Sequence, residues 1–130
     1  MKNLPPQDGP PTLPVGVEPI RTGSGLEYLD IQAGDGAGAS PGMIVRIHYH
    51  GWLTNGTLIE STVERDDPLE FVVGDGQVIA ALDEGVVGMK VGGARRLIVP
   101  SDLAYGPQGS GDLIPPDASL ILDVGLLDVR

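Results

Sequence analysis

Two tyrosines and a set of apolar side chains are the residues of this chain whose types and spacing fit a binding pocket. Tyr49 lies in a stretch that alternates apolar and polar residues, and Tyr105 lies on a turn that follows a proline. Apolar side chains that could surround them occur at Ile79, Leu82, Leu113 and Ile114. An apolar depression with a few polar tips is the usual form of a small-ligand site. The residue pattern alone favours a plain core with two locally satisfied tyrosine hydroxyls, but it leaves both interpretations open.

Other arrangements of reactive side chains have simpler explanations. His48 and His50 share one face of a predicted strand, opposite its apolar residues, so we expect both to face solvent. No third ligand clusters with them, and we expect no metal and no cofactor. Gly74-Asp75-Gly76 lacks the third glycine of a dinucleotide fingerprint and indicates a turn. No serine lies in a nucleophile elbow, which argues against hydrolase chemistry.

The carboxylates show no spacing that singles out a catalytic pair. Asp83 and Glu84 are neighbours on a predicted helix, so they point in different directions and are expected to be solvated. Solvated surface is also the expectation for carboxylates beside turns and on exposed alternations, namely Asp66, Asp67, Asp123 and Asp128.

Composition narrows the classes of partner. The formal net charge is −10, which argues against binding to nucleic acid or to an anionic membrane surface. The chain has no cysteine, which excludes disulfides and thiolate chemistry. Apolar residues make up 41% and aromatic residues only 4%, so the core is predicted to be aliphatic. No apolar run typical of a secretory signal follows Met1. The compartment is left open, with the cytoplasm as default and export if a signal was removed.

The first part of the chain differs from the rest. Half of the twelve prolines lie within the first twenty residues, where they remove backbone donors. We therefore predict a proline-rich flexible leader over residues 1–24 and one folded domain over 25–130.

Two periodicities predict the elements of that domain. Apolar residues alternate at Val45, Ile47 and Tyr49, around Phe71 and again from Leu120 to Leu126, which is typical of half-buried strands. Asn55-Gly56 indicates a hairpin turn. Between residues 78 and 87 the spacing of Ile79, Leu82 and Val86 changes to one face of a short helix, with Gly88 as its stop. The fold class is therefore α+β, with an antiparallel sheet of five to six strands around one short helix.

Three segments together resemble the FKBP family of peptidyl-prolyl isomerases. They are VIAALDEGVVGMKVGGARRL over residues 78–97, Pro100-x-x-Leu103-Ala104-Tyr105-Gly106, and Ile114-Pro115-Pro116. The resemblance covers about half of the chain and implies the FKBP-like fold, in which the sheet wraps around the helix.

The resemblance also implies a site. Tyr49 in His48-Tyr49-His50-Gly51 matches a pocket wall, Tyr105 matches the hydroxyl donor, and the Ile79 N–H matches the group that receives a ligand carbonyl. Val78, Phe71, Leu113 and Ile114 match further lining positions. Glu60 stands where the family usually has aspartate, and Ser110 where histidine is frequent. Aliphatic residues replace family aromatics at Ile59, Leu69, Leu82 and Leu122.

The function that follows is rotation about X-Pro bonds, as a folding helper acting on proline-containing peptides or unfolded proteins. Macrolide inhibitors are expected to bind weakly because four rings are missing. A monomer is expected. The alternative is a pocket-degenerate FKBP domain that serves as a non-catalytic protein-binding module.

Overall fold

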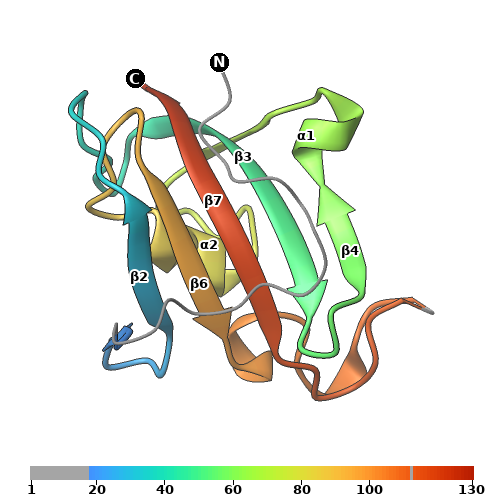
Figure 1. Cartoon of the computed structure of the whole chain (residues 1–130). Helices are drawn as coiled ribbons and strands as arrows, with labels where there is room; N and C mark the ends of the chain where they lie inside the picture. Colours follow the sequence, from blue (N-terminus) through green and yellow to red (C-terminus); the bar gives the residue numbers. More distant parts are fainter. Residues whose placement is uncertain (1–17, 112) are drawn as a thin grey trace.

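The computed structural model describes residues 18–111 and 113–130, with residues 64 and 65 described only by their backbone. These residues form one sheet of seven strands with a short helix on one face (Figure 1). All the strand pairings are antiparallel. The α+β fold predicted from the sequence is confirmed, although the sheet has more strands than the five to six expected.

The sheet order is β1-β2-β6-β7-β3-β4, and β5 pairs with β3 beside this path. The strands are β1 (Ile20–Arg21), β2 (Glu27–Gln32), β3 (Ile44–Leu53), β4 (Leu58–Ser61), β5 (Leu69–Val72), β6 (Ala94–Val99) and β7 (Leu120–Val129). The first half of β3 pairs with β5 and its second half with β4, so one long strand holds two short ones. β1 lies inside the segment predicted as leader and pairs with β2.

The helices are short. They are α1 (Thr62–Arg65), α2 (Ala80–Gly85) and the 3₁₀ turns η1 (Ser101–Leu103) and η2 (Gly106–Gln108). α2 is shorter than the predicted 78–87, because Ile79 has the extended angle ψ 149° and caps the helix. Gly88 has a φ of 86° but lies beyond the end of α2 rather than at its stop. No helix among the described residues is long and apolar enough to cross a membrane.

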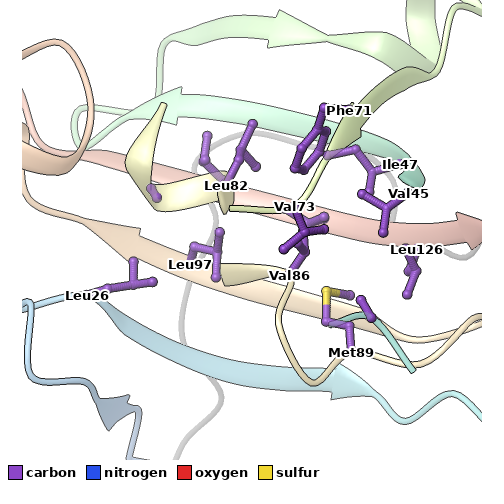
Figure 2. Close-up of a cluster of buried hydrophobic side chains, with 14 of the residues drawn as sticks. Leu26, Val45, Ile47, Phe71, Val73, Leu82, Val86, Met89, Leu97 and Leu126 are labelled. Atoms are coloured by element: carbon purple, nitrogen blue, oxygen red, sulfur yellow. The ribbon is translucent and has the colours of Figure 1, made fainter. Parts of the chain in front are cut away.

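The core lies between α2 and the sheet (Figure 2). Leu82 of α2 and Val86, which caps its C-terminal end, pack in one cluster with Ile47 of β3, Leu97 of β6 and Phe71 of β5. As the composition predicts, the buried cluster is almost wholly aliphatic, with Phe71 as its one ring. Gly85 allows α2 to approach β6 closely, since a Cβ there would lie 2.6 Å from a methyl group of Leu97.

The opposite face of the sheet differs from the prediction. His48 and His50, expected in solvent, are only 4% and 2% exposed. Nδ1 of His48 lies 2.9 Å from Oγ1 of Thr62, and Nδ1 of His50 lies 2.9 Å from Oγ of Ser61. Asp123 was also predicted to be solvated and is buried. Alternation separates the two faces of a strand correctly, but it does not tell whether the outer face is covered.

Candidate functional site

A cavity of about 590 Å³ opens at the end of the sheet where α2 begins. Its walls come from β3, β4, β5, α2 with the segment that enters it, the connection between β6 and β7, and the start of β7. The residues that line it are Tyr49, Ile59, Glu60, Leu69, Gly76, Gln77, Val78, Ile79, Leu82, Tyr105, Ser110, Leu113, Ile114, Leu120 and Leu122.

The structure brings together all but one of the residues that the sequence assigned to the site. The exception is Phe71, which does not line the cavity. Its side chain lies in the core and is 3% exposed (Figure 2). Its strand alternation with Leu69 and Val73 marks it as buried, but alternation cannot distinguish the bottom of a pocket from the core beneath it.

The floor of the cavity is apolar and tightly packed. Leu82 of α2 and Leu122 of β7 are both buried. Gly51 of β3 passes directly behind this floor, and a Cβ there would lie 2.9 Å from Cδ2 of Leu122 and 3.5 Å from Cγ1 of Ile59. Leu120 also lines the floor and was not assigned to the site from the sequence, although it shares the inward face of its strand with Leu122.

Few polar groups point at the cavity. The Tyr105 hydroxyl has no hydrogen-bond partner among the described residues, and the residue is 39% exposed. The Ile79 N–H likewise has no acceptor within that part of the chain, whereas the Ile79 carbonyl accepts bonds from the N–H groups of Leu82 and Asp83. Glu60 Oε1 accepts a bond of 3.2 Å from the N–H of Ser61.

Thr62 supports the Tyr49 wall from behind. Its Oγ1 accepts a bond of 2.8 Å from the Tyr49 N–H and also contacts Nδ1 of His48. Thr62 is fully buried in α1, which follows β4 directly. No periodicity in the sequence indicates this contact, because it joins residues that meet only after β3 and β4 have paired.

A tight loop forms the outer rim. Ser110 and Ile114 exchange two backbone hydrogen bonds, of 2.9 Å from the Ser110 N–H and 3.1 Å from the Ile114 N–H. Gly109 makes this closure possible, since its φ is 67° and a Cβ there would lie 2.3 Å from the Ile114 carbonyl oxygen. Leu113 is half exposed at the tip, and Ile114 is buried beneath it.

The cavity does not resemble an acid–base or metal centre. Among the described residues, no three His, Asp or Glu side chains gather as metal ligands. Glu60 is the one ionisable carboxylate of the lining, and the histidines lie on the outer face of the sheet, bonded to Thr62 and Ser61. An apolar bowl with a free N–H and a free hydroxyl can desolvate a bound amide and hold its carbonyl groups.

Known proteins are similar to this chain in sequence and in fold. Residues 36–127 match the family model described as FKBP-type peptidyl-prolyl cis-trans isomerase. The chain is 49% identical over 105 residues to the FK506-binding protein of Neisseria meningitidis serogroup B, covering 81% of this chain and 96% of that protein. It is 51% identical over 86 residues to FK506-binding protein 2 of Dictyostelium discoideum, covering 66% and 65%.

Two solved structures agree. AtFKBP13 superposes with a TM-score of 0.81 at 34% identity, over 88% of this chain and all of the other. FkpA from Escherichia coli superposes with a TM-score of 0.78 at 37% identity, over 86% of this chain and 51% of the other. The chain therefore belongs to the FKBP-type peptidyl-prolyl cis-trans isomerase family and is an isomerase of X-Pro peptide bonds.

Proposed function

We propose that the X-Pro bond of the substrate turns inside this cavity, and that the site acts by desolvation and positioning. Rotation about a peptide bond crosses a barrier of about 18–20 kcal/mol, and X-Pro bonds take tens to hundreds of seconds unaided. The twisted amide has lost its resonance and is less polar than the planar one. A dry apolar bowl therefore favours the transition state over the ground state, without an acid, a base or a nucleophile.

The observation that carries this proposal is the Ile79 N–H, which has no acceptor among the described residues and lies at an apolar cavity. We assign to it, and to the Tyr105 hydroxyl, the binding of substrate carbonyls. Leu82 and Leu122 supply the floor, and Glu60 orients the wall at the end of β4. The remaining lining residues enclose the proline ring, namely Tyr49, Ile59, Leu69, Val78, Leu113 and Ile114.

The substrates in this proposal are proline-containing peptides and unfolded proteins, with a bulky apolar residue preferred before proline. The chain is proposed to act as a monomer. FK506-type macrolides would use the same cavity. Their affinity should be reduced because four positions that carry rings in the family, Ile59, Leu69, Leu82 and Leu122, are aliphatic here.

Replacement of Ile79 by proline tests the proposal directly. Ile79 has a φ of −59°, close to the value of about −65° that proline imposes, so Ile79→Pro removes the N–H with little change in φ. Ile79→Ala is the matched control, because it removes the side chain and retains the N–H. In a protease-free assay on tetrapeptides, Ile79→Pro should lose far more kcat/KM than Ile79→Ala, at similar melting temperatures. Equal losses in the two variants would refute the role of this N–H.

A further inference from the structure

The segment between β5 and α2 forms one wall of the cavity with very little regular structure. Residues 76–79 line the cavity, and the two glycines of the segment have positive φ, 87° at Gly74 and 73° at Gly76. A segment of this kind depends on side chains to fix its backbone, because it has no ladder or helix to satisfy its N–H groups.

Asp83 supplies that fixation from α2. Its Oδ1 accepts a bond of 2.8 Å from the Gly74 N–H, and its Oδ2 accepts a bond of 2.9 Å from the Gly76 N–H. Hydrogen bonds to an ionised acceptor are roughly twice as strong as neutral ones. The two oxygens of one carboxylate thus bind two N–H groups of the wall segment. The expectation from the sequence that Asp83 is simply solvated is therefore wrong.

Asp83 also binds the carbonyl group of Ile79 through its own backbone. The Asp83 N–H donates to the Ile79 carbonyl at 3.2 Å, within the first turn of α2. Asp83 therefore binds the segment before Ile79 through its side chain and Ile79 itself through its backbone. A second tie, 2.9 Å from the Val72 N–H to Oε1 of Gln77, fixes the middle of the segment. These contacts fix the backbone on both sides of the Ile79 N–H and so limit the direction in which it points.

We infer that Asp83 is a positioning residue for the isomerisation, which aims the Ile79 N–H at the substrate carbonyl without touching the substrate. This inference rests on the proposed role of the Ile79 N–H. Glu60, at another wall of the cavity, accepts a bond from the N–H of the next residue, Ser61, whereas Asp83 accepts bonds from the segment that precedes Ile79.

The next residue provides a matched control. Glu84 leaves α2 in another direction and accepts bonds of 2.6 Å from Oγ1 of Thr22 and 2.6 Å from Oγ of Ser24. It therefore also makes two charge-assisted hydrogen bonds from the same helix, but to the turn between β1 and β2, and it does not line the cavity. A purely structural contribution should be similar for the two carboxylates.

The experiment compares Asp83→Ala, Asp83→Asn and Glu84→Ala in the full chain. Activity on a Leu-Pro tetrapeptide, thermal melting and amide hydrogen exchange of Gly74, Gly76 and Ile79 are measured for each. We expect Asp83→Ala to lose about tenfold or more in kcat/KM, since a shift of one ångström in a positioning group can cost roughly a hundredfold. Faster exchange at Gly74 and Gly76 should accompany the loss.

Asp83→Asn keeps the shape of the side chain and one oxygen, but it places an NH₂ group opposite one of the two N–H groups. Its kcat/KM should therefore lie between those of the wild type and Asp83→Ala. This comparison still holds if the alanine variant melts at a low temperature. Glu84→Ala should retain kcat/KM within about twofold. Equal losses in Asp83→Ala and Glu84→Ala, or wild-type kcat/KM in both Asp83 variants, would overturn the inference. If Ile79→Pro is inactive while Asp83→Ala is fully active, only this inference fails; if Ile79→Pro is active, the proposed function of the N–H fails.

Discussion

Arg96 of β6 and Asp123 of β7 form a bidentate ion pair between neighbouring strands. Nε of Arg96 lies 2.7 Å from Oδ1 of Asp123, and Nη2 lies 2.8 Å from Oδ2. The Asp123 side chain is only 1% exposed, and that of Arg96 12%. The hydrogen bonds that Arg96 donates to Asp123 raise the pKa of Arg96 above its ordinary value, against the opposing effect of burial. The pair lies on the outer face of the sheet, away from the cavity.

We predict that Asp123→Ala lowers the free energy of unfolding by about 3–5 kcal/mol, because it leaves a guanidinium buried without its carboxylate. Since folding raises the pKa of Arg96, its contribution is complete below the unfolded value and is lost only as pH rises through the folded value. The titration of Arg96 should therefore add no slope to stability at neutral pH. Urea unfolding at several pH values measures both quantities.

The exposed pair of Arg46 and Glu70 serves as the control for that measurement. Its nitrogen–oxygen distance is 4.0 Å and both side chains are more than 40% exposed. Arg46→Ala should cost only about 0–1 kcal/mol. A similar loss in both variants would show that burial does not set the strength of the Arg96–Asp123 pair.

Tyr105→Phe separates a substrate contact from a structural one. The Tyr105 hydroxyl has no partner among the described residues, so its removal should change stability by less than about 0.5 kcal/mol. If this hydroxyl holds a substrate carbonyl, kcat/KM should fall several-fold at an unchanged melting temperature. Tyr28→Phe, on β2 beneath the Arg95 guanidinium at 4.4 Å, is the control and should leave kcat/KM unchanged. A loss of stability without a loss of activity in Tyr105→Phe would contradict the assignment.

Leu82→Trp should raise macrolide affinity by restoring a ring to the floor of the cavity. A ring contact adds about 0.5–1.5 kcal/mol beyond the buried area, which corresponds to roughly two- to tenfold in Kd. Overpacking could cost about 1–3 kcal/mol of stability, because Leu82 is already buried in the core. Leu82→Met, which keeps the volume and adds no ring, is the control for replacement of the leucine itself. Calorimetry gives the affinities, and equal values for the two variants would show that rings at this position are not limiting.

Gly109→Ala should disturb the outer rim of the cavity while the core stays intact. Its Cβ would lie 2.3 Å from the Ile114 carbonyl oxygen, so the Ser110–Ile114 bridge must open. Gly111 has a similar φ of 56°, but a Cβ there would meet nothing within 4 Å. Gly111→Ala therefore measures the cost of a positive φ at alanine without a steric clash. We expect kcat/KM to fall clearly more in Gly109→Ala than in Gly111→Ala, and equal activities would contradict a role for the bridge.

Local patterns in the sequence predict much of this fold and site. The spacing of Ile79, Leu82 and Val86 predicts the helix and its buried face, because that information lies within about two helical turns of the chain. Residue types make Tyr105 and Ile114 candidates for a pocket, but no periodicity indicates them, and only the resemblance to a family gives them roles in it.

The remaining features depend on contacts between distant segments. His48 is buried against Thr62, and Arg96 pairs with Asp123, only after separate strands have come together. Asp83 carries no local sign that its carboxylate will meet the N–H groups of Gly74 and Gly76. Alternation places Phe71 inside the domain, but the depth that separates core from cavity is set by the whole sheet.

The position of β7 has a consequence for how the domain folds. β7 is the last strand along the chain, yet it lies between β6 and β3 (Figure 1). It also supplies Leu120 and Leu122 to the cavity floor. Pairing with β3 requires closure of a loop that spans most of the domain, and such non-local contacts slow folding. Until β7 docks, β3 and β6 expose edges that could pair with other chains. Because β7 supplies part of the cavity floor, the isomerase has no complete active site until this non-local pairing has formed.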